Sequence, residues 1–207
     1  ETAIEFPRYD IRYHSFMSIV NNTFINGGDS SALTILGSLD FVNNVLSNWT
    51  FSGGNLIHIY QHKNQCQINV FNNTLINNRG IRVLYVSSNC LNTSISWNDV
   101  KDNIISHHAV EIRVYHGEEI VKEASFHGNE IVGNMLVSSG SCKAASALKI
   151  SGFRRISAER NIISNPQFKH EVSVTQQTLD QSSTINMPFN YFGTDNPDEL
   201  LKRIFDG

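Results

Sequence analysis

The side chains best suited to acid–base chemistry are Arg82, Glu111 and Arg113. A carboxylate beside an arginine could exchange protons with an acidic polysaccharide, and glycoside hydrolysis uses a second carboxylate as well. The aspartates of the repeats described below do not share one phase: Asp40, Asp99 and Asp102. Charge pairing across a solvated sheet face is the more common role of such residues. We therefore expect no catalytic site and no enzymatic activity.

The eight histidines raise the question of a metal site. His58 and His62 have helical spacing, but His58 falls in an expected strand, where residues four apart are about 13 Å from each other. His107 and His108 are adjacent and would point to opposite sides of a strand. Neither pair forms a ligand set with Cys or carboxylate, so the sequence predicts no metal site and no cofactor.

A repeat organises most of the chain. Asparagine anchors recur at intervals of 22 to 32 residues: Asn22, Asn44, Asn73, Asn98, Asn129, Asn161 and Asn190. The residues two places after and three places before each anchor are apolar, and those five places before are apolar except Thr93. A spacing of two is strand periodicity. Each repeat thus predicts strand, corner, strand, with Asn at the bend because it tolerates the left-handed backbone region.

Most intervals hold a third alternating run: Leu33 to Leu36, Leu56 to Tyr60, Ile81 to Val86, Val110 to Tyr115 and Val172 to Thr175. Stacked coils of this kind bury a continuous core and place the anchors over one another, where their amides can bond as a ladder. The sequence predicts an all-β fold, a parallel β-helix of about seven coils. A β-sandwich also has many short strands but gives no reason for Asn to return at one phase.

The third strands define one outer face. If Ile59, Val83, Ile112 and Ile150 point inward, the outward residues form one column: Thr34, His58, Arg82, Glu111, Lys149 and Ser173. This column contains the acid–base candidates.

We expect a single domain over residues 1–207. Residues 1–15 form an N-terminal edge segment, residues 16–194 form the coils, and residues 195–207 form a capping helix. Asn196 is an N-cap residue with Pro197 at the first helical position, followed by acids and then by Lys202 and Arg203. One apolar face is expected to cover the end of the stack: Leu200, Leu201, Ile204 and Phe205.

The form apolar-x-apolar-x-x-Asn-x-apolar, from Phe16 to Phe192, resembles the right-handed parallel β-helix repeats of the pectate-lyase-like superfamily. The closing Asn190-Tyr191-Phe192-Gly193-Thr194, with Arg203-Ile204-Phe205-Asp206, is similar to the ends of β-helical segments in the bark beetle (Anakonda) family of insect tricellular-junction proteins. The resemblance implies right-handed coils and an extracellular, glycosylated adhesion segment of a longer transmembrane chain. The Asp-rich and Gly-His-Gly signatures of similar polygalacturonases are absent.

Two cysteines occupy nearly the same phase of neighbouring coils. Cys66 lies seven residues before Asn73, and Cys90 lies eight before Asn98. Stacking would bring them within the Cα separation that a disulfide prefers, so we predict a Cys66–Cys90 bridge, with two buried free thiols as the alternative. Cys142 is left over and is either free or paired outside this segment.

Sequons for N-glycosylation stand at Asn21, Asn48, Asn72 and Asn92. A chain with 24 Asn generates sequons by chance, so their number is no evidence of secretion. Asn21 and Asn72 sit beside corners and Asn92 precedes a strand, where a glycan could project. Asn48 falls near the turn beyond the second strand.

Charge and hydropathy exclude two classes of partner. The formal net charge is −3 with scattered Lys and Arg, which argues against a nucleic-acid surface. No apolar run is long enough to cross a bilayer. The chain begins at Glu1 without an initiating Met or a targeting segment, so we expect it to be a piece of a larger extracellular protein.

The leading hypothesis is a non-enzymatic extracellular scaffold for cell adhesion or junction assembly, as part of a membrane-protein ectodomain. Its expected partners are other modules of the same chain, neighbouring adhesion molecules, a second copy, or glycans. Two alternatives stay open: a polysaccharide lyase or hydrolase fragment, and a glycan-binding module. Trp49 and Trp97 could contact carbohydrate, but both adjoin corners, where structural packing explains them as well.

Overall fold

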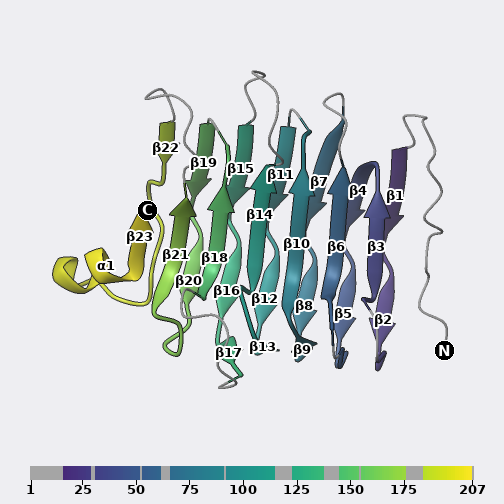
Figure 1. The fold of residues 1–207 in the computed structure, drawn as a ribbon, viewed down its shortest axis with the longest axis horizontal. Helices are drawn as coiled ribbons and strands as arrows, with labels where there is room; N and C mark the ends of the chain where they lie inside the picture. Colours follow the sequence, from purple (N-terminus) through teal and green to yellow (C-terminus); the bar gives the residue numbers. More distant parts are fainter. Residues whose placement is uncertain are drawn as a thin grey trace.

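The computed structural model describes residues 16–28, 31–51, 53–61, 66–90, 92–114, 123–137, 145–153, 155–175 and 184–206. Parallel sheets account for almost all of its regular structure (Figure 1). We name them sheets A, B, C and D in the order in which the chain reaches them within one coil. The expected N-terminal edge segment, residues 1–15, lies outside the described residues.

Sheet A contains β1 (Phe16–Val20), β4 (Ser38–Val42), β7 (Gln67–Phe71), β11 (Asn92–Ser96), β15 (Glu123–His127), β19 (Arg155–Glu159) and β22 (Thr184–Asn186). Sheet B contains β2 (Thr23–Ile25), β5 (Val45–Ser47), β8 (Thr74–Ile76), β12 (Asp99–Lys101), β16 (Glu130–Val132) and β20 (Ile162–Ser164). Sheet C is short, with β9 (Arg79–Gly80), β13 (Ile104–Ile105) and β17 (Met135–Leu136). Sheet D contains β3 (Leu33–Leu36), β6 (Asn55–Gln61), β10 (Arg82–Ser88), β14 (Val110–Val114), β18 (Ser146–Ser151), β21 (His170–Thr175) and β23 (Ile204–Asp206).

The chain visits sheets A, B and D in rotation, with a strand of sheet C between B and D in the middle coils. Each strand pairs in parallel with the equivalent strand of the next coil, as Phe41 of β4 does with Val70 of β7. The expected all-β parallel solenoid is therefore present. Its core consists of columns of inward side chains, and one column contains Phe41, Val70, Ile95 and Phe126, all at most 1% exposed.

The predicted asparagine ladder runs through the coils from Asn22 to Asn190. At every step, the backbone N–H and the side-chain Nδ2 of one anchor donate to Oδ1 of the next, at 2.8–3.0 Å and 2.9–3.3 Å. Nδ2 also donates to a backbone carbonyl of the preceding coil, as Asn98 does to Val70 at 2.9 Å. The five central anchors are at most 1% exposed. Their polar atoms are bonded to one another, so burying them leaves few unpaired groups.

A second ladder lies at the corner that follows sheet B, and it was not anticipated. It contains Asn78, Asn103, Asn134 and Asn165, each of which donates twice to the next at 2.8–3.1 Å. The backbone N–H of Trp49 starts the ladder by donating to Asn78 Oδ1 at 3.0 Å. Glu171 ends it by accepting from the N–H and Nδ2 of Asn165 at 2.6 and 3.0 Å. The available signal was the spacing: Asn78, Asn103 and Asn134 lie five residues after the anchors Asn73, Asn98 and Asn129, and Asn165 lies four after Asn161.

The left-handed backbone at the corners belongs to the residue before the anchor, so the expected placement on the anchor itself was wrong by one position. The residues at φ of 52–64° at this corner are Asn21, Asn43, Asn72, Trp97, Gly128, Arg160 and Phe189. The anchor must instead keep its amide turned inward along the ladder. The left-handed backbone conformation costs a non-Gly residue roughly 1–2 kcal/mol. Trp97 and Phe189 are bulky residues to adopt it.

The C-terminal end differs in part from the expected capping helix. Helix α1 (Pro197–Arg203) has the predicted N-cap, because Asn196 Oδ1 accepts from the N–H of Asp198 at 3.0 Å. The helix ends at Arg203, however, and Ile204 and Phe205 continue as β23, which pairs with β21. The open edge of β21 supplies backbone partners that a further helical turn would leave unused. Leu201 is 77% exposed, so the four expected apolar residues do not form one covering face.

Figure 1 shows α1 and β23 at one end of the stack, with β1, β2 and β3 at the other. Among the described residues, the structure contains no helix with the length and apolar character needed to span a bilayer.

Candidate functional site

The acid–base candidates meet on the outer face of sheet D. Arg82 Nε lies 2.6 Å from Glu111 Oε2, and Lys149 Nζ lies 3.9 Å from Glu111 Oε1. The Glu111 side chain is only 6% exposed. The Arg82 guanidinium also sits 4.9 Å above the ring of Tyr85. Because both carboxylate oxygens face cations and the carboxylate is covered, the arrangement favours charge pairing over proton transfer to a ligand.

The predicted outward column was partly wrong. The residue beside His58 and Glu111 in register is Tyr85, and the inward residue beside Ile59 is Val86 rather than Val83. Arg82 lies three residues earlier, opposite Asn55. Val83 has no partner in the register with β6, and the N–H groups of Val83 and Leu84 both donate to the carbonyl of Ala109 at 3.1 Å, so one extra residue at this point shifts the alternation predicted for Ile81 to Val86. Arg82 still reaches Glu111 because its side chain is long. Arg113 lies in the next row, opposite Ser87.

The remaining acidic candidates stay apart. Asp40 accepts from Asn69 Nδ2 at 3.2 Å, and Asp99 lies 3.3 Å from Lys101. Asp102 is a left-handed corner residue at φ 55°. In the part of the chain that the structure describes, no three His, Cys, Asp or Glu side chains are grouped so that they could hold a metal ion.

His58 of β6 and His107, in the turn between β13 and β14, contact neighbouring side chains. His58 stacks against Tyr85 with ring centroids 5.0 Å apart. His107 Nδ1 lies 3.1 Å from Ser106 Oγ, and burial, followed by the nearby charge of Arg82, lowers the His107 pKa. His62 lies outside the described residues.

His108 is held as a neutral imidazole. It is 3% exposed, and its Nδ1 accepts a hydrogen bond from the backbone N–H of Ser146 at 3.1 Å. An Nδ1 that accepts from an amide carries no proton, so the ring proton is on Nε2. Burial lowers the His108 pKa to about 4. This histidine therefore links two coils and is not available as a ligand or a base.

The predicted disulfide is present: Cys66 and Cys90 are bonded, with their Cα atoms 4.7 Å apart. It connects two coils where the chain passes from sheet D to sheet A. Cys142 lies outside the described residues.

All four sequon asparagines are exposed. Asn21, Asn48 and Asn72 occupy left-handed corners at φ 52–59°, and Asn92 is the first residue of β11. Asn72 Nδ2 donates to Asn43 Oδ1 at 2.8 Å. Three sequons thus line the two edges of sheet B, where a glycan has room to extend; their occupancy stays a prediction.

The two tryptophans have different environments. Trp49 is 7% exposed, donates from Nε1 to the carbonyl of Phe24 at 3.2 Å, and packs on Gly27, where an added Cβ would lie 2.0 Å from its ring. Trp49 is therefore a packing residue. Trp97 is 50% exposed and meets the ring of His127 edge-on at 5.4 Å.

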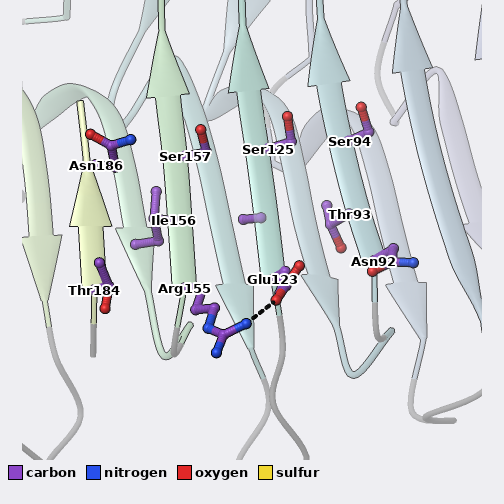
Figure 2. Close-up of a pocket in the computed structure, with 11 residues that line it drawn as sticks. Asn92, Thr93, Ser94, Glu123, Ser125, Arg155, Ile156, Ser157, Thr184 and Asn186 are labelled. Carbon is purple, nitrogen blue, oxygen red and sulfur yellow. Dashed lines mark hydrogen bonds and ion pairs between the residues drawn. The ribbon is translucent and has the colours of Figure 1, made fainter. Parts of the chain in front are cut away.

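An open groove of about 420 Å³ lies on the outer face of sheet A (Figure 2). Its central row consists of Ser94, Ser125, Ser157 and Asn186, which are neighbours in register from β11 to β22. A second row follows one edge: Asn92, Glu123, Arg155 and Thr184. Arg155 Nη1 and Glu123 Oε1 are 3.0 Å apart.

Short side chains make this groove. The residue four places before every anchor is small and polar, from Ser18 through Asp40 and Asn69 to Asn186. The signal for this row is the small polar residue between the two apolar positions before each anchor. Because the row is uncharged from Ser94 onward, the groove floor there can offer hydroxyl and amide hydrogen bonds to a ligand.

Comparison of the chain with protein-family models, with curated proteins and with solved structures finds no match. Function must therefore be argued from the fold and from the groove and cluster described above.

Proposed function

We propose that this chain is a right-handed parallel β-helix segment of about seven coils that acts as a non-enzymatic extracellular scaffold in cell adhesion or cell-junction assembly. The observation that carries the proposal is the asparagine ladder, which joins the coils from Asn22 to Asn190 by paired amide hydrogen bonds. A stack linked in this way resists bending and holds its outer faces at constant spacing. Such a rod suits a role in which modules or neighbouring chains meet a fixed surface.

Two further features support parts of the proposal. The Cys66–Cys90 bridge suits an oxidising compartment, as expected for an ectodomain at a cell junction. Glu111, the best acid–base candidate, is covered and faces both Arg82 and Lys149. That environment favours the non-enzymatic reading over a polysaccharide lyase or hydrolase.

The test is adhesion by the displayed chain. The chain is anchored on the surface of cells that do not aggregate, and aggregation is measured with these cells alone and mixed with epithelial cells. The proposal expects more clustering than with an unrelated β-helix displayed at equal density. No clustering in either mixture, with the displayed chain folded and its disulfide formed, contradicts it. Degradation of an anionic polysaccharide that is lost on Arg82→Ala or Glu111→Ala contradicts the non-enzymatic part.

A further inference from the structure

Exposed side chains gather where sheets A and B meet, in the C-terminal half of the stack. We name them the corner patch: Trp97, Arg160, Ile162, Phe189 and Tyr191. Arg160 and Phe189 each directly precede an anchor of the first ladder, so they are neighbours on successive coils. Tyr191 pairs with Ile162 through a parallel bridge. The four uncharged members are 42–82% exposed, so three aromatic rings and one aliphatic side chain face solvent beside a guanidinium.

The backbone conformation of the corner does not explain these residue types. Trp97, Arg160 and Phe189 have φ of 56–59°, in the left-handed region. Asn tolerates that region better than bulky residues do, and the first three coils have it at the equivalent corner: Asn21, Asn43 and Asn72. Phe189 is 82% exposed, so packing within the chain offsets little of its strain. Strain that the fold does not require indicates a role in binding.

The ring of Trp97 leans along the stack toward Arg160. Gly128 occupies the same corner on the next coil, and a Cβ added there would lie 2.8 Å from the Trp97 ring. The ring therefore lies over Gly128, which separates Trp97 from Arg160. With neighbouring strands about 4.8 Å apart, the corner from Trp97 to Phe189 spans roughly 14 Å. The two aromatic residues thus flank Arg160 on either side.

Arg160 supplies a charge that the surrounding side chains do not neutralise. Within the described part of the chain, no carboxylate lies at ion-pair distance from its guanidinium. The neighbouring carboxylates face other groups: Glu159 Oε1 lies 3.3 Å from His127 Nδ1, and Glu130 Oε2 lies 2.6 Å from Lys101 Nζ. An arginine in this position can form a charge-assisted hydrogen bond with a carboxylate from another molecule.

The composition of the corner patch is typical of a protein-binding site. Trp, Tyr and Arg are enriched among the residues that dominate binding energy at interfaces. Anionic lipid surfaces attract clusters of basic residues, and the patch contains a single one. Strand addition is disfavoured as well, because the N–H of Tyr191 donates to Asn161 at 2.9 Å and its carbonyl accepts from Ile163 at 2.8 Å. A partner must therefore bind through side chains.

We propose that the corner patch binds an acidic, apolar segment of a partner protein, with a carboxylate on Arg160 and apolar side chains against Phe189 and Tyr191. A stable interface uses roughly 20–30 residues on each side, so five residues provide an anchor point for a short segment with a micromolar Kd. This inference names the chemistry of a partner for the proposed scaffold and rests on that role.

The experiment selects short peptides from a random display library on the folded chain, with counter-selection on Phe189→Asn. Selected peptides are synthesised, and their Kd is measured by fluorescence anisotropy with wild type, Phe189→Asn and Arg160→Gln. Arg79→Gln is the matched control, because Arg79 is an exposed arginine of β9 on sheet C, three coils away. Phe189→Asn introduces the residue that other coils have at this corner, so its urea midpoint should not fall. A loss of binding in that variant is then not a loss of folding.

The proposal expects selected peptides that combine Asp or Glu with aromatic or aliphatic residues. They should bind at least tenfold more weakly to Arg160→Gln and Phe189→Asn than to wild type, and equally to Arg79→Gln. Three results would overturn it: no enriched peptide, enriched peptides without an acidic residue, or equal binding by Arg160→Gln and wild type.

Two further measurements separate the alternatives. Binding to phosphatidylserine vesicles that is lost in Phe189→Asn, with no peptide bound, would assign the patch to a membrane surface and overturn the proposal. A failed adhesion assay with peptide binding intact would reject the adhesion role and leave the corner patch supported. Cell clustering without any peptide binding would reject the corner patch alone.

Discussion

Arg203, the last residue of helix α1, places its Nη1 atom 3.0 Å from Oε1 of Glu171, a carboxylate with no exposed side-chain area. Glu171 is also the residue that ends the second amide ladder, through its two bonds from Asn165. A buried carboxylate needs a paired charge and several hydrogen bonds to be tolerated. The ion pair therefore joins the C-terminal helix to the hydrogen-bonded interior of the stack.

Removing the cation should leave an uncompensated buried charge. We expect Arg203→Met to lower the free energy of unfolding by about 3 kcal/mol, measured by urea denaturation at pH 7. Adding Glu171→Gln should recover at least half of this loss, because elsewhere in the ladder a single amide oxygen accepts both donors. Lys202→Met, at an exposed position of the same helix, is the control. A cost below about 0.5 kcal/mol for Arg203→Met, as for a surface pair, would contradict the assignment.

Removing one rung of the first ladder should be costly. Asn98 Oδ1 accepts two bonds from Asn73, and its Nδ2 bonds to Val70 and Asn129. Asn98→Ala leaves these buried groups unpaired, so we expect a loss of about 3 kcal/mol or more in urea denaturation.

The matched control for that rung is Asn69→Ala. Asn69 is an outward residue of β7 with one described side-chain bond, to Asp40. It should lose less than about 1 kcal/mol. Similar losses at Asn98 and Asn69 would show that the ladder does not stabilise the stack.

Thr93 is the polar exception among the inward framing positions. It is 2% exposed, between Ile68 and Ala124 in register, and its Oγ1 has no hydrogen-bond partner. Thr93→Val keeps the shape of the side chain and removes the unpaired hydroxyl, so we expect a gain of about 1 kcal/mol in thermal or urea denaturation. Thr34→Val, at an outward position of β3, should change stability little. A loss of stability in Thr93→Val would mean that the hydroxyl is paired.

His108 should make stability depend on pH. Its folded pKa of about 4 lies below the ordinary value of 6.5, so between these values the unfolded chain binds a proton that the folded chain does not. Stability should therefore fall as pH drops from about 6.5 to 4, by up to about 3 kcal/mol from this residue.

The comparison variant for His108 is His108→Asn. The amide oxygen of Asn can still accept from the N–H of Ser146 and does not titrate. Urea denaturation at pH 7.5, 5.5 and 4.5 should show a shallower dependence in the variant than in wild type. Identical slopes would contradict a buried neutral His108.

The disulfide should stabilise the stack by restricting the unfolded chain. It closes a loop with a sequence separation of 24, for which the chain-entropy estimate is about 3 kcal/mol. We expect a loss of that size when Cys66 and Cys90 are both replaced by Ala. Reduction should raise the intact mass by the mass of two hydrogen atoms for this bridge. A mass that does not change when the protein is reduced would exclude the bridge.

The sequence alone determined the class of fold, the first ladder and the cysteine pair. All three depend on residues that recur at one phase of the repeat, such as Asn73 with Asn98, or Cys66 with Cys90. In a parallel stack, equal phase means vertical contact, so a pattern along the chain translates directly into neighbours in space.

The tertiary structure decided the strand register at the corners and the pairing at the C-terminal end of the stack. The extra residue at Val83, which has no partner in the register, shifts the alternation so that Tyr85, rather than Arg82, lies beside Glu111. Ile204 and Phe205 pair with the edge of β21 as strand β23 and do not continue the helix. Glu171 can occupy the last position of the second ladder, where the other members are Asn, because Arg203 near the end of the chain pairs with its buried carboxylate. Corner length and edge pairing arise from contacts between distant segments, which a local period does not encode.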